Sequence, residues 1–224
     1  MRREYHTDML VSGQQAETTA SERGPKARTR KLMLQAAIAL MQSGITPSVT
    51  EVAEAAEVSR ATAYRYFPSQ AALVQAVVDE ALGPILKWHS NDPDPKERIR
   101  DLLATSMPRI DEFEATFKAA LKLSLDQWAQ RQAGTLGNEP RFTRGHRVDL
   151  LKDVTAPLDG KIAPAKRVRL EHALSLVFGV ETLVVLKDIW GLSAAEAQDV
   201  AEWAATILVD ATLSEAGIKI AKSG

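Results

Sequence analysis

Arginine, tyrosine, serine and threonine side chains gather between Thr50 and Phe67, in the segment TEVAEAAEVSRATAYRYF. A guanidinium group can pair with guanine O6 and N7 or with a phosphate, and side-chain hydroxyl groups suit phosphate oxygens. The residues of this segment that we expect to contact double-stranded DNA are Thr50, Ser59, Arg60, Thr62, Tyr64, Arg65 and Tyr66. The types and spacing of these side chains therefore predict a surface that binds the backbone and base edges of DNA.

Two short helices joined by a tight turn must position these side chains. The first is predicted to begin at about residue 49 or 50, Glu57 and Val58 make the turn, and Ser59 caps the second. Apolar residues of both helices share an inward face: Val52, Ala53, Val58, Ala63 and Phe67. This is the pattern of a helix-turn-helix, whose second helix enters the major groove. The alternative is a solvated helix of an ordinary α-helical bundle.

Positive charge is concentrated around this segment. Residues 23–70 hold seven Lys and Arg against three Glu, whereas residues from 71 onward hold 19 bases against 22 acids, within a net charge of −1. Arg28, Arg30 and Lys31 stand before or at the start of a first predicted helix, where they would attract phosphates and make binding sensitive to salt. The alternative for these bases is a solubilising role.

Composition narrows the function classes. The chain has 224 residues, is 45% hydrophobic and has no cysteine, which excludes disulfides and thiolate sites and fits a reducing cytoplasm. No apolar run approaches the ~20 residues of a membrane span, and no apolar stretch follows Arg2 and Arg3, so no signal peptide is predicted. Its four histidines lack metal-site spacing and no glycine-rich phosphate loop occurs, so we expect no metal, no cofactor and no enzyme.

Helical periodicity extends along the whole chain after a polar start. We predict a disordered tail at 1–24, a DNA-binding domain at 25–83 that includes a fourth, linking helix ending at Gly83-Pro84, and a helical domain at 84–224. Within the last domain, helices are expected near 84–90, 94–107, 109–132, 145–158, 164–190 and 194–215, separated by segments rich in Pro and Gly. The expected fold class is all-α.

The segment Arg28 to Leu82 resembles the N-terminal domain of the TetR family of one-component transcriptional regulators, most clearly in TEVAEAAEVSRATAYRYFPSQAALVQAVVDEAL. The resemblance implies three helices with a helix-turn-helix, a linking helix, and a helical domain for ligand binding and dimerisation. It places Thr50, Ser59, Arg60, Thr62, Tyr64, Arg65 and Tyr66 where such regulators touch DNA.

The chain departs from the family pattern at four positions. Glu57 and Ala61 stand where glycine is usual, and Ala63 replaces a bulkier apolar residue. Gln70 stands where a lysine that contacts phosphate is common, which puts that one contact in doubt.

The last two predicted helices suggest a dimer. The stretch from Ala173 to Leu186 is apolar on nearly every face, and residues of 194–215 form a stripe at helical spacing. Two such helices from each subunit would make a four-helix interface, for which the candidates are Val177, Val184, Trp203, Ile207 and Leu208. The alternative is that both helices are buried only against their own chain.

A small-molecule site is the least specified part of the prediction. The resemblance implies an effector among the middle helices, and our candidates are Phe117, Trp128, His146, Phe178 and Glu181. The aromatic residues have the alternative of plain core, and Glu181 that of a structural bond. The group Arg141, Arg144, His146 and Arg147 is either a solvated loop or a gate for an anion.

The function that follows is a dimeric repressor that binds a near-palindromic operator and is released by a small molecule. The alternative is a DNA-bound scaffold or activator whose body binds a protein, which an exposed apolar patch away from the dimer face, without an enclosed cavity, would favour.

Overall fold

The computed structural model describes residues 24–142 and 145–218, and every regular element in these ranges is helical, as predicted. Four helices form what we call the head: α2 (Pro25–Gln42), α3 (Val49–Ala55), α4 (Arg60–Tyr66) and α5 (Gln70–Leu82). A short 3-10 turn, η1 (Gly83–Lys87), leads to the body: α6 (Pro95–Glu112), α7 (Glu114–Gln132), α8 (His146–Thr155), η2 (Ala156–Leu158), α9 (Pro164–Leu174), α10 (Val180–Leu183), the π-helical turn η3 (Val184–Ile189) and α11 (Ala194–Glu215). The tail predicted to be disordered lies outside the described residues, apart from Gly24.

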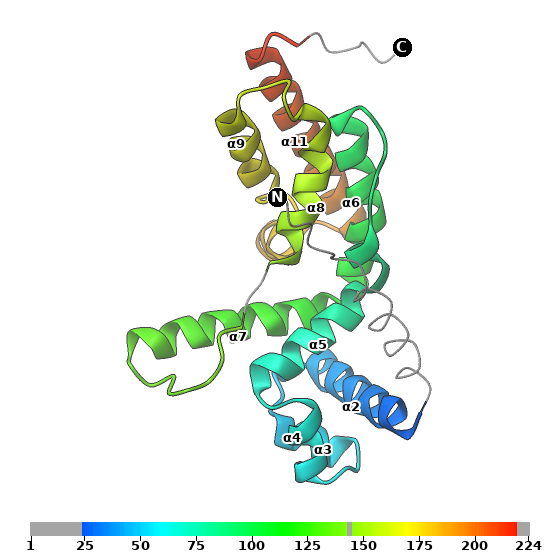
Figure 1. Ribbon diagram of the computed structural model, residues 1–224, viewed down its shortest axis with the longest axis vertical. Helices are drawn as coiled ribbons and strands as arrows, with labels where there is room; N and C mark the ends of the chain where they lie inside the picture. The colour runs from blue at the N-terminus through cyan, green and yellow to red at the C-terminus, as the bar shows by residue number, and fades with distance from the viewer. Residues whose placement is uncertain (1–23, 143–144, 219–224) are drawn as a thin grey trace, which may run out of the picture.

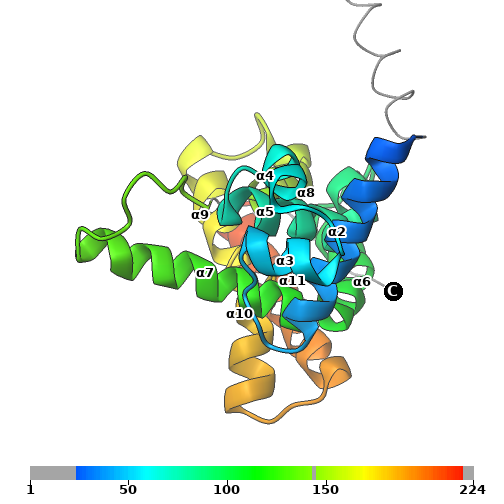
Figure 2. The ribbon, with the colours of Figure 1, turned by 90° about the horizontal axis from the view of Figure 1, so that it is seen from below.

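Head and body meet along α5 and α7. Figure 1 shows the head at the lower end, an upright bundle of α6, α8, α9 and α11 above it, and α7 lying across the molecule between them. The far half of α7 projects sideways beyond the other helices, which Figure 2 shows from below. Because α5 and α2 both pack on α7, the head is joined to the body by more than the connecting chain.

Serine side chains fix the starts of the helices in the head. Ser48 caps α3 in a reciprocal capping box with Glu51, and the hydrogen bond from the Ser48 backbone N–H lowers the pKa of the Glu51 carboxyl. Ser59 accepts from the Thr62 N–H to cap α4, and Ser69 accepts from the Ala72 N–H to cap α5. The apolar faces of α3 and α4 then meet in a core that contains Val52, Ala53, Ala63 and Phe67.

The turn between α3 and α4 is strained at one residue. Glu57 has φ 54°, and among the described residues it is the only one other than glycine with a positive φ. A Cβ atom makes this left-handed conformation unfavourable by about 1 kcal/mol. Glycine, the residue usual in the family, would relieve that strain.

We therefore expect Glu57→Gly to raise the free energy of unfolding by about 0.5–1 kcal/mol, measured by urea unfolding. Glu57→Ala is the matched control, because it removes the same carboxylate and keeps the Cβ atom. Equal effects of the two substitutions would show that backbone strain is not the cause.

Two predicted helix boundaries are wrong. Pro108 was expected to separate two helices, but it lies within α6, which continues to Glu112. Pro108 is exposed, so the helix loses one hydrogen bond there without burying an unpaired carbonyl in the core. The helix expected at 164–190 is broken between α9 and α10, where Gly179 has φ 113° and leaves room for the Arg147 guanidinium. No periodicity in the sequence signals this long-range packing.

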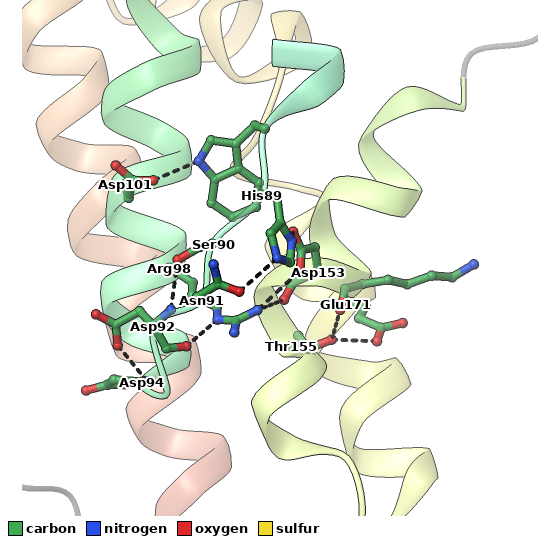
Figure 3. Close-up of polar contacts among 12 residues, drawn as sticks. His89, Ser90, Asn91, Asp92, Asp94, Arg98, Asp101, Asp153, Thr155 and Glu171 are labelled. Carbon is green, nitrogen blue, oxygen red and sulfur yellow. Dashed lines mark hydrogen bonds and ion pairs between the residues drawn. The ribbon is translucent and has the colours of Figure 1, made fainter. Parts of the chain in front are cut away.

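Arg98 ties the segment between η1 and α6 to α8 (Figure 3). It is 8% exposed, and it donates to the Asp92 carbonyl and to both the carbonyl (2.8 Å) and the carboxylate (3.2 Å) of Asp153. His89 Nδ1 lies 2.7 Å from the same Asp153 carboxylate, and its Nε2 lies 3.1 Å from Asn91. Arg98 thus anchors the chain segment that connects head to body.

Replacing Arg98 by Met removes the donor to the Asp92 and Asp153 carbonyls and leaves the Asp153 carboxylate, 20% exposed, with its contact to His89. We expect Arg98→Met to lower the free energy of unfolding by about 2–4 kcal/mol in urea. Asp153→Asn keeps an acceptor for Arg98, so it should lower the free energy of unfolding by about half as much as Arg98→Met, or less. If Arg98→Met costs under about 1 kcal/mol, Arg98 does not anchor this segment.

Among the described residues, no helix has the length and apolar character that crossing a bilayer requires.

Candidate functional site: a helix-turn-helix head and an apolar cavity

The outer face of α4 is open to solvent while its inner face is packed. Tyr64 and Arg65 are exposed, and Ala63 and Phe67 are buried against α3. Arg65 also lies over the ring of Tyr66, 5.7 Å from its centroid. The helix therefore presents an aromatic hydroxyl and a guanidinium on a fixed base, which is the requirement for reading DNA.

At the start of α4, Arg60 is paired with a carboxylate of α3. Its Nη2 atom lies 2.8 Å from Glu54 Oε1, with both side chains largely exposed. Thr62 is half-buried and its hydroxyl accepts from Ser59 Oγ at 2.9 Å, while Thr50 is half-buried in the first turn of α3. If Arg60 binds DNA, it must either give up its ion pair with Glu54 or keep that pair while it also contacts the DNA.

Two residues of the head have partners inside the protein. Tyr66 was expected on the outside, yet it is half-buried and its hydroxyl donates to the Lys26 carbonyl at 3.1 Å, which joins α4 to the start of α2. Gln70 donates to the carbonyls of Thr46 and Pro47, at 3.2 and 3.1 Å, and so fastens the loop before α3. A structural role for Gln70 was missed, because its partners are more than twenty residues away in the sequence.

The first turns of α2 carry the basic residues predicted to attract phosphate. Lys26, Arg28, Arg30 and Lys31 are all exposed there. Arg30 also lies over the ring of Phe67, 5.8 Å from its centroid, so this helix end is packed against the end of α4. The structure thus brings the predicted basic group and the predicted recognition helix into one domain.

A cavity of about 80 Å³ lies between α5 and the body. Its apolar wall consists of Val78, Leu82, Ile110, Phe117, Ala120, Phe142, Leu150, Phe178 and Val180. Gln75, His146 and Arg147 supply its polar side chains. Three of the five predicted ligand residues, Phe117, His146 and Phe178, thus line one space, while Trp128 lies outside it, 57% exposed on the projecting part of α7.

Two polar contacts lie beside the cavity at the start of α8. Asp79 Oδ1 of α5 accepts from Gln75 Nε2 at 2.8 Å and lies 2.8 Å from His146 Nε2. Arg147 forms an ion pair with Glu181 of α10 and donates to the Ser175 carbonyl at 3.1 Å. The fifth predicted residue, Glu181, therefore contacts a residue of the cavity wall without lining the cavity itself.

The C-terminal end of α5 is held by α6. Arg109 donates to the carbonyls of Ala81 and Glu80, which the end of a helix leaves without helical partners. Gly83, with φ 48°, follows, and a Cβ atom there would lie 2.9 Å from Arg109 Nη2. A movement of α5 would therefore change the contact of Asp79 with His146, beside the cavity, and the hydrogen bonds from Arg109.

Comparison with known proteins settles the family of the head. Residues 33–77, which span most of α2 and α5 and all of α3 and α4, match the sequence profile of the bacterial regulatory proteins of the tetR family. The head therefore carries the sequence pattern of this family.

A solved structure shows a similar fold over most of the chain. It is similar to a TetR transcriptional regulator from Rhodococcus sp. RHA1, with a TM-score of 0.54 and 20% identity, covering 83% of this chain and 97% of that one. A proposed TetR-family regulator from Mesorhizobium loti MAFF303099 gives a TM-score of 0.49 and 17% identity, covering 86% and 98%. No curated protein matches the chain.

Outside the head, the chain exposes apolar side chains along α11 and η3. Small residues of α11 such as Ala197, Ala201 and Ala205 face the core, and the larger Trp203 and Ile207 point outward, 66% and 50% exposed. Of the other predicted dimer residues, Val177 and Leu208 are half-buried against their own core, and Val184 is half-buried. Val200, the first residue of the predicted stripe, is also exposed, and so are Val185, Ile189 and Trp190, which were not among the named dimer candidates.

A group of ion pairs fixes η3 against the junction of α6 and α7. Lys187 lies 2.5 Å from both Asp111 and Glu114, and Lys118 lies 2.7 Å from Glu114 and from Asp188. The hydrogen bond to Asp111, followed by that to Glu114, raises the pKa of Lys187. These contacts hold the segment that carries Val185, Ile189 and Trp190.

Because the folded-state pKa of Lys187 lies above its unfolded value of about 10.4, the charged pair stabilises the fold fully at neutral pH. This contribution is lost as the pH rises above about 10.4 and through the folded-state pKa. Urea unfolding should show that the free energy of unfolding of the wild type decreases between pH 8 and pH 11. We expect a smaller decrease for Lys187→Met. Lys122→Met, which removes an exposed pair with Asp126, is the control and should leave that fall unchanged.

Proposed function

We propose that the chain is a transcriptional repressor that binds a near-palindromic operator as a dimer and leaves it when a small molecule binds in the body. The match of residues 33–77 to the tetR-family profile supports regulation of transcription through DNA binding. The observation that supports operator binding most directly is the exposed pair Tyr64 and Arg65 on a helix whose inner face is buried. Its site of action would be the cytoplasm, where bacterial DNA lies.

The proposed DNA contacts fall into two groups. Tyr64, Arg65 and Arg60 are exposed on α4, which would enter the major groove, while Arg28 and Arg30 are exposed on α2 and would meet phosphates. Four further candidates are Thr50, Ser59, Thr62 and Tyr66. The first group should carry sequence preference, and the second should carry much of the salt dependence.

The outer face of α11 supports a two-fold dimer. A large apolar surface that its own chain leaves uncovered is typical of a subunit interface. Trp203 on α11 and Trp190 at the end of η3 are both exposed, so association through both segments would bury two indole rings per subunit. Two heads held in this way would reach successive major grooves on one side of the DNA, about 34–36 Å apart.

The position of the cavity supports release by a ligand. Its wall includes Gln75, Val78 and Leu82 of α5, the helix that begins three residues after α4 ends. A molecule that widens the cavity must move α5 or the body helices opposite it. A shift of a few ångströms in each head would prevent both from docking at once.

A second candidate function is a DNA-bound scaffold or activator that recruits another protein. Leu125 and Trp128, exposed side by side on the projecting part of α7, are the observation that favours it. The cavity beside α5 favours the repressor instead, because a scaffold requires no such space.

Selection of genomic fragments on the full chain tests operator binding. The recovered fragment should bind, by fluorescence anisotropy, at least about a thousandfold more tightly than unrelated DNA of equal length. Affinity should fall linearly with salt on a double-logarithmic plot. Equal affinity for recovered and unrelated DNA would refute the proposal.

A further inference from the structure

The polar side chains that line the cavity are Gln75, His146 and Arg147, and among the described residues no acidic side chain lines it. His146 and Arg147, neighbours at the start of α8, both line the cavity, whereas their partners Asp79 and Glu181 do not. Both bases come from one helix, and their carboxylate partners come from two others, α5 and α10. The surface offered to a molecule inside the cavity is therefore apolar with a basic end.

The backbone of the protein is shaped around one of these bases. At Gly179, which has φ 113°, a Cβ atom would lie 2.8 Å from Arg147 Nη2 and 3.3 Å from a Glu181 carboxylate oxygen. Any other residue would push the guanidinium away. The break between α9 and α10 thus gives Arg147 its place at the cavity wall, where its side chain is 22% exposed.

We propose that the effector is a small apolar acid, whose carboxylate takes Arg147 and His146 from Glu181 and Asp79. This inference rests on the proposed function and names the chemical class of its ligand. Asp79 and Glu181 pair with the same two bases that the ligand carboxylate would contact when bound. The apolar remainder of the ligand would contact Phe117, Phe142 and Phe178.

The exchange of partners would reach the head through Asp79. Asp79 lies on α5 and its contact with His146, at 2.8 Å, joins that helix to α8. When a ligand carboxylate replaces Asp79 at His146, α5 loses this charged link and keeps the contact of Gln75 with His146, at 2.9 Å, and the hydrogen bonds from Arg109. The negative charge of the ligand head group, and not only the size of the ligand, would therefore control the position of α5.

Three probes with the same ring separate the possible head groups: phenylacetate, phenylacetamide and 2-phenylethylamine. We expect calorimetry on the full chain to show phenylacetate binding at least about tenfold more tightly than the amide, with the amine weakest. The inference is overturned if the amide or the amine binds as well as the acid, or if none of the three binds.

Variants assign the preference to the named bases. Arg147→Met should reduce the preference for acid over amide to less than about threefold, while Arg141→Met, an exposed base outside the cavity, should keep it. Glu181→Gln retains the size of the side chain and removes its competing charge, so it should bind phenylacetate several-fold more tightly, a gain that misfolding cannot produce. A loss of acid binding in Glu181→Gln would contradict the exchange.

The same protein without a probe separates this inference from the proposed function. If the chain binds its operator and prefers no acid, only the ligand class is wrong. If the chain binds no DNA, the proposed function fails whatever the probes show.

Discussion

The double substitution Tyr64→Ala with Arg65→Ala is expected to lower operator affinity by at least about a hundredfold. Each dimer loses four side chains at once, and a side chain that pairs with a base or a phosphate is worth about 1–3 kcal/mol of binding free energy. Both residues are exposed on α4, and Arg65 lies over the ring of Tyr66. Anisotropy on the selected fragment, in one salt concentration, measures the loss.

Stability and charge are the two controls for this variant. Its unfolding free energy should stay within about 0.5 kcal/mol of the wild type, because exposed side chains contribute little to folding. Arg131→Ala removes one positive charge at the exposed end of α7 and should change operator affinity by less than about twofold. If the double variant binds like the wild type, α4 does not contact DNA in the way proposed.

The double substitution Trp203→Glu with Ile207→Glu is expected to convert the dimer into a monomer at micromolar concentration. Both side chains point outward from α11, so charge there opposes association without disturbing the small residues that pack inward. In a dimer, binding of one head holds the other at a high effective concentration near the DNA. A monomer has one head and lacks this gain. Operator affinity should consequently fall by about 10²–10⁴.

A matched pair of substitutions on another surface is the control for this prediction. Leu125→Glu with Trp128→Glu introduces the same charges at two side chains that are similarly exposed, on the projecting part of α7. This control should sediment as a dimer and bind the operator normally. A wild-type chain that sediments as a monomer, or a Trp203 and Ile207 variant that remains dimeric, would show that α11 is not the interface.

Local chemistry in the sequence predicted the head well. Helix caps depend on residues three positions apart, so Ser59 and Ser69 could be recognised from the sequence, and the buried face of Ala63 and Phe67 follows from helical spacing. The roles of Tyr66 and Gln70 could not be found in this way, since their partners at Lys26, Thr46 and Pro47 are brought near only by the folded chain.

The body was predicted in outline, and its details depend on tertiary packing. An unbroken apolar pattern between residues 173 and 186 predicted one helix, yet the chain breaks at Gly179 to admit Arg147 from α8. The same break decides which residues of the region face outward, which is why Ile189 and Trp190 were missed. The cavity residues Phe117 and Phe178 were found because bulky aromatic residues on middle helices are frequent there, and Trp128 shows that this criterion alone is insufficient.

Hydroxyl-radical footprinting on the selected operator tests the central claim, that two heads of one dimer dock together. The account predicts two protected half-sites related by two-fold symmetry, on one face of the DNA, with centres about 10 base pairs apart. Both half-sites should disappear together in the Trp203 and Ile207 variant. A single protected half-site in the wild type, or protection without symmetry, would contradict it.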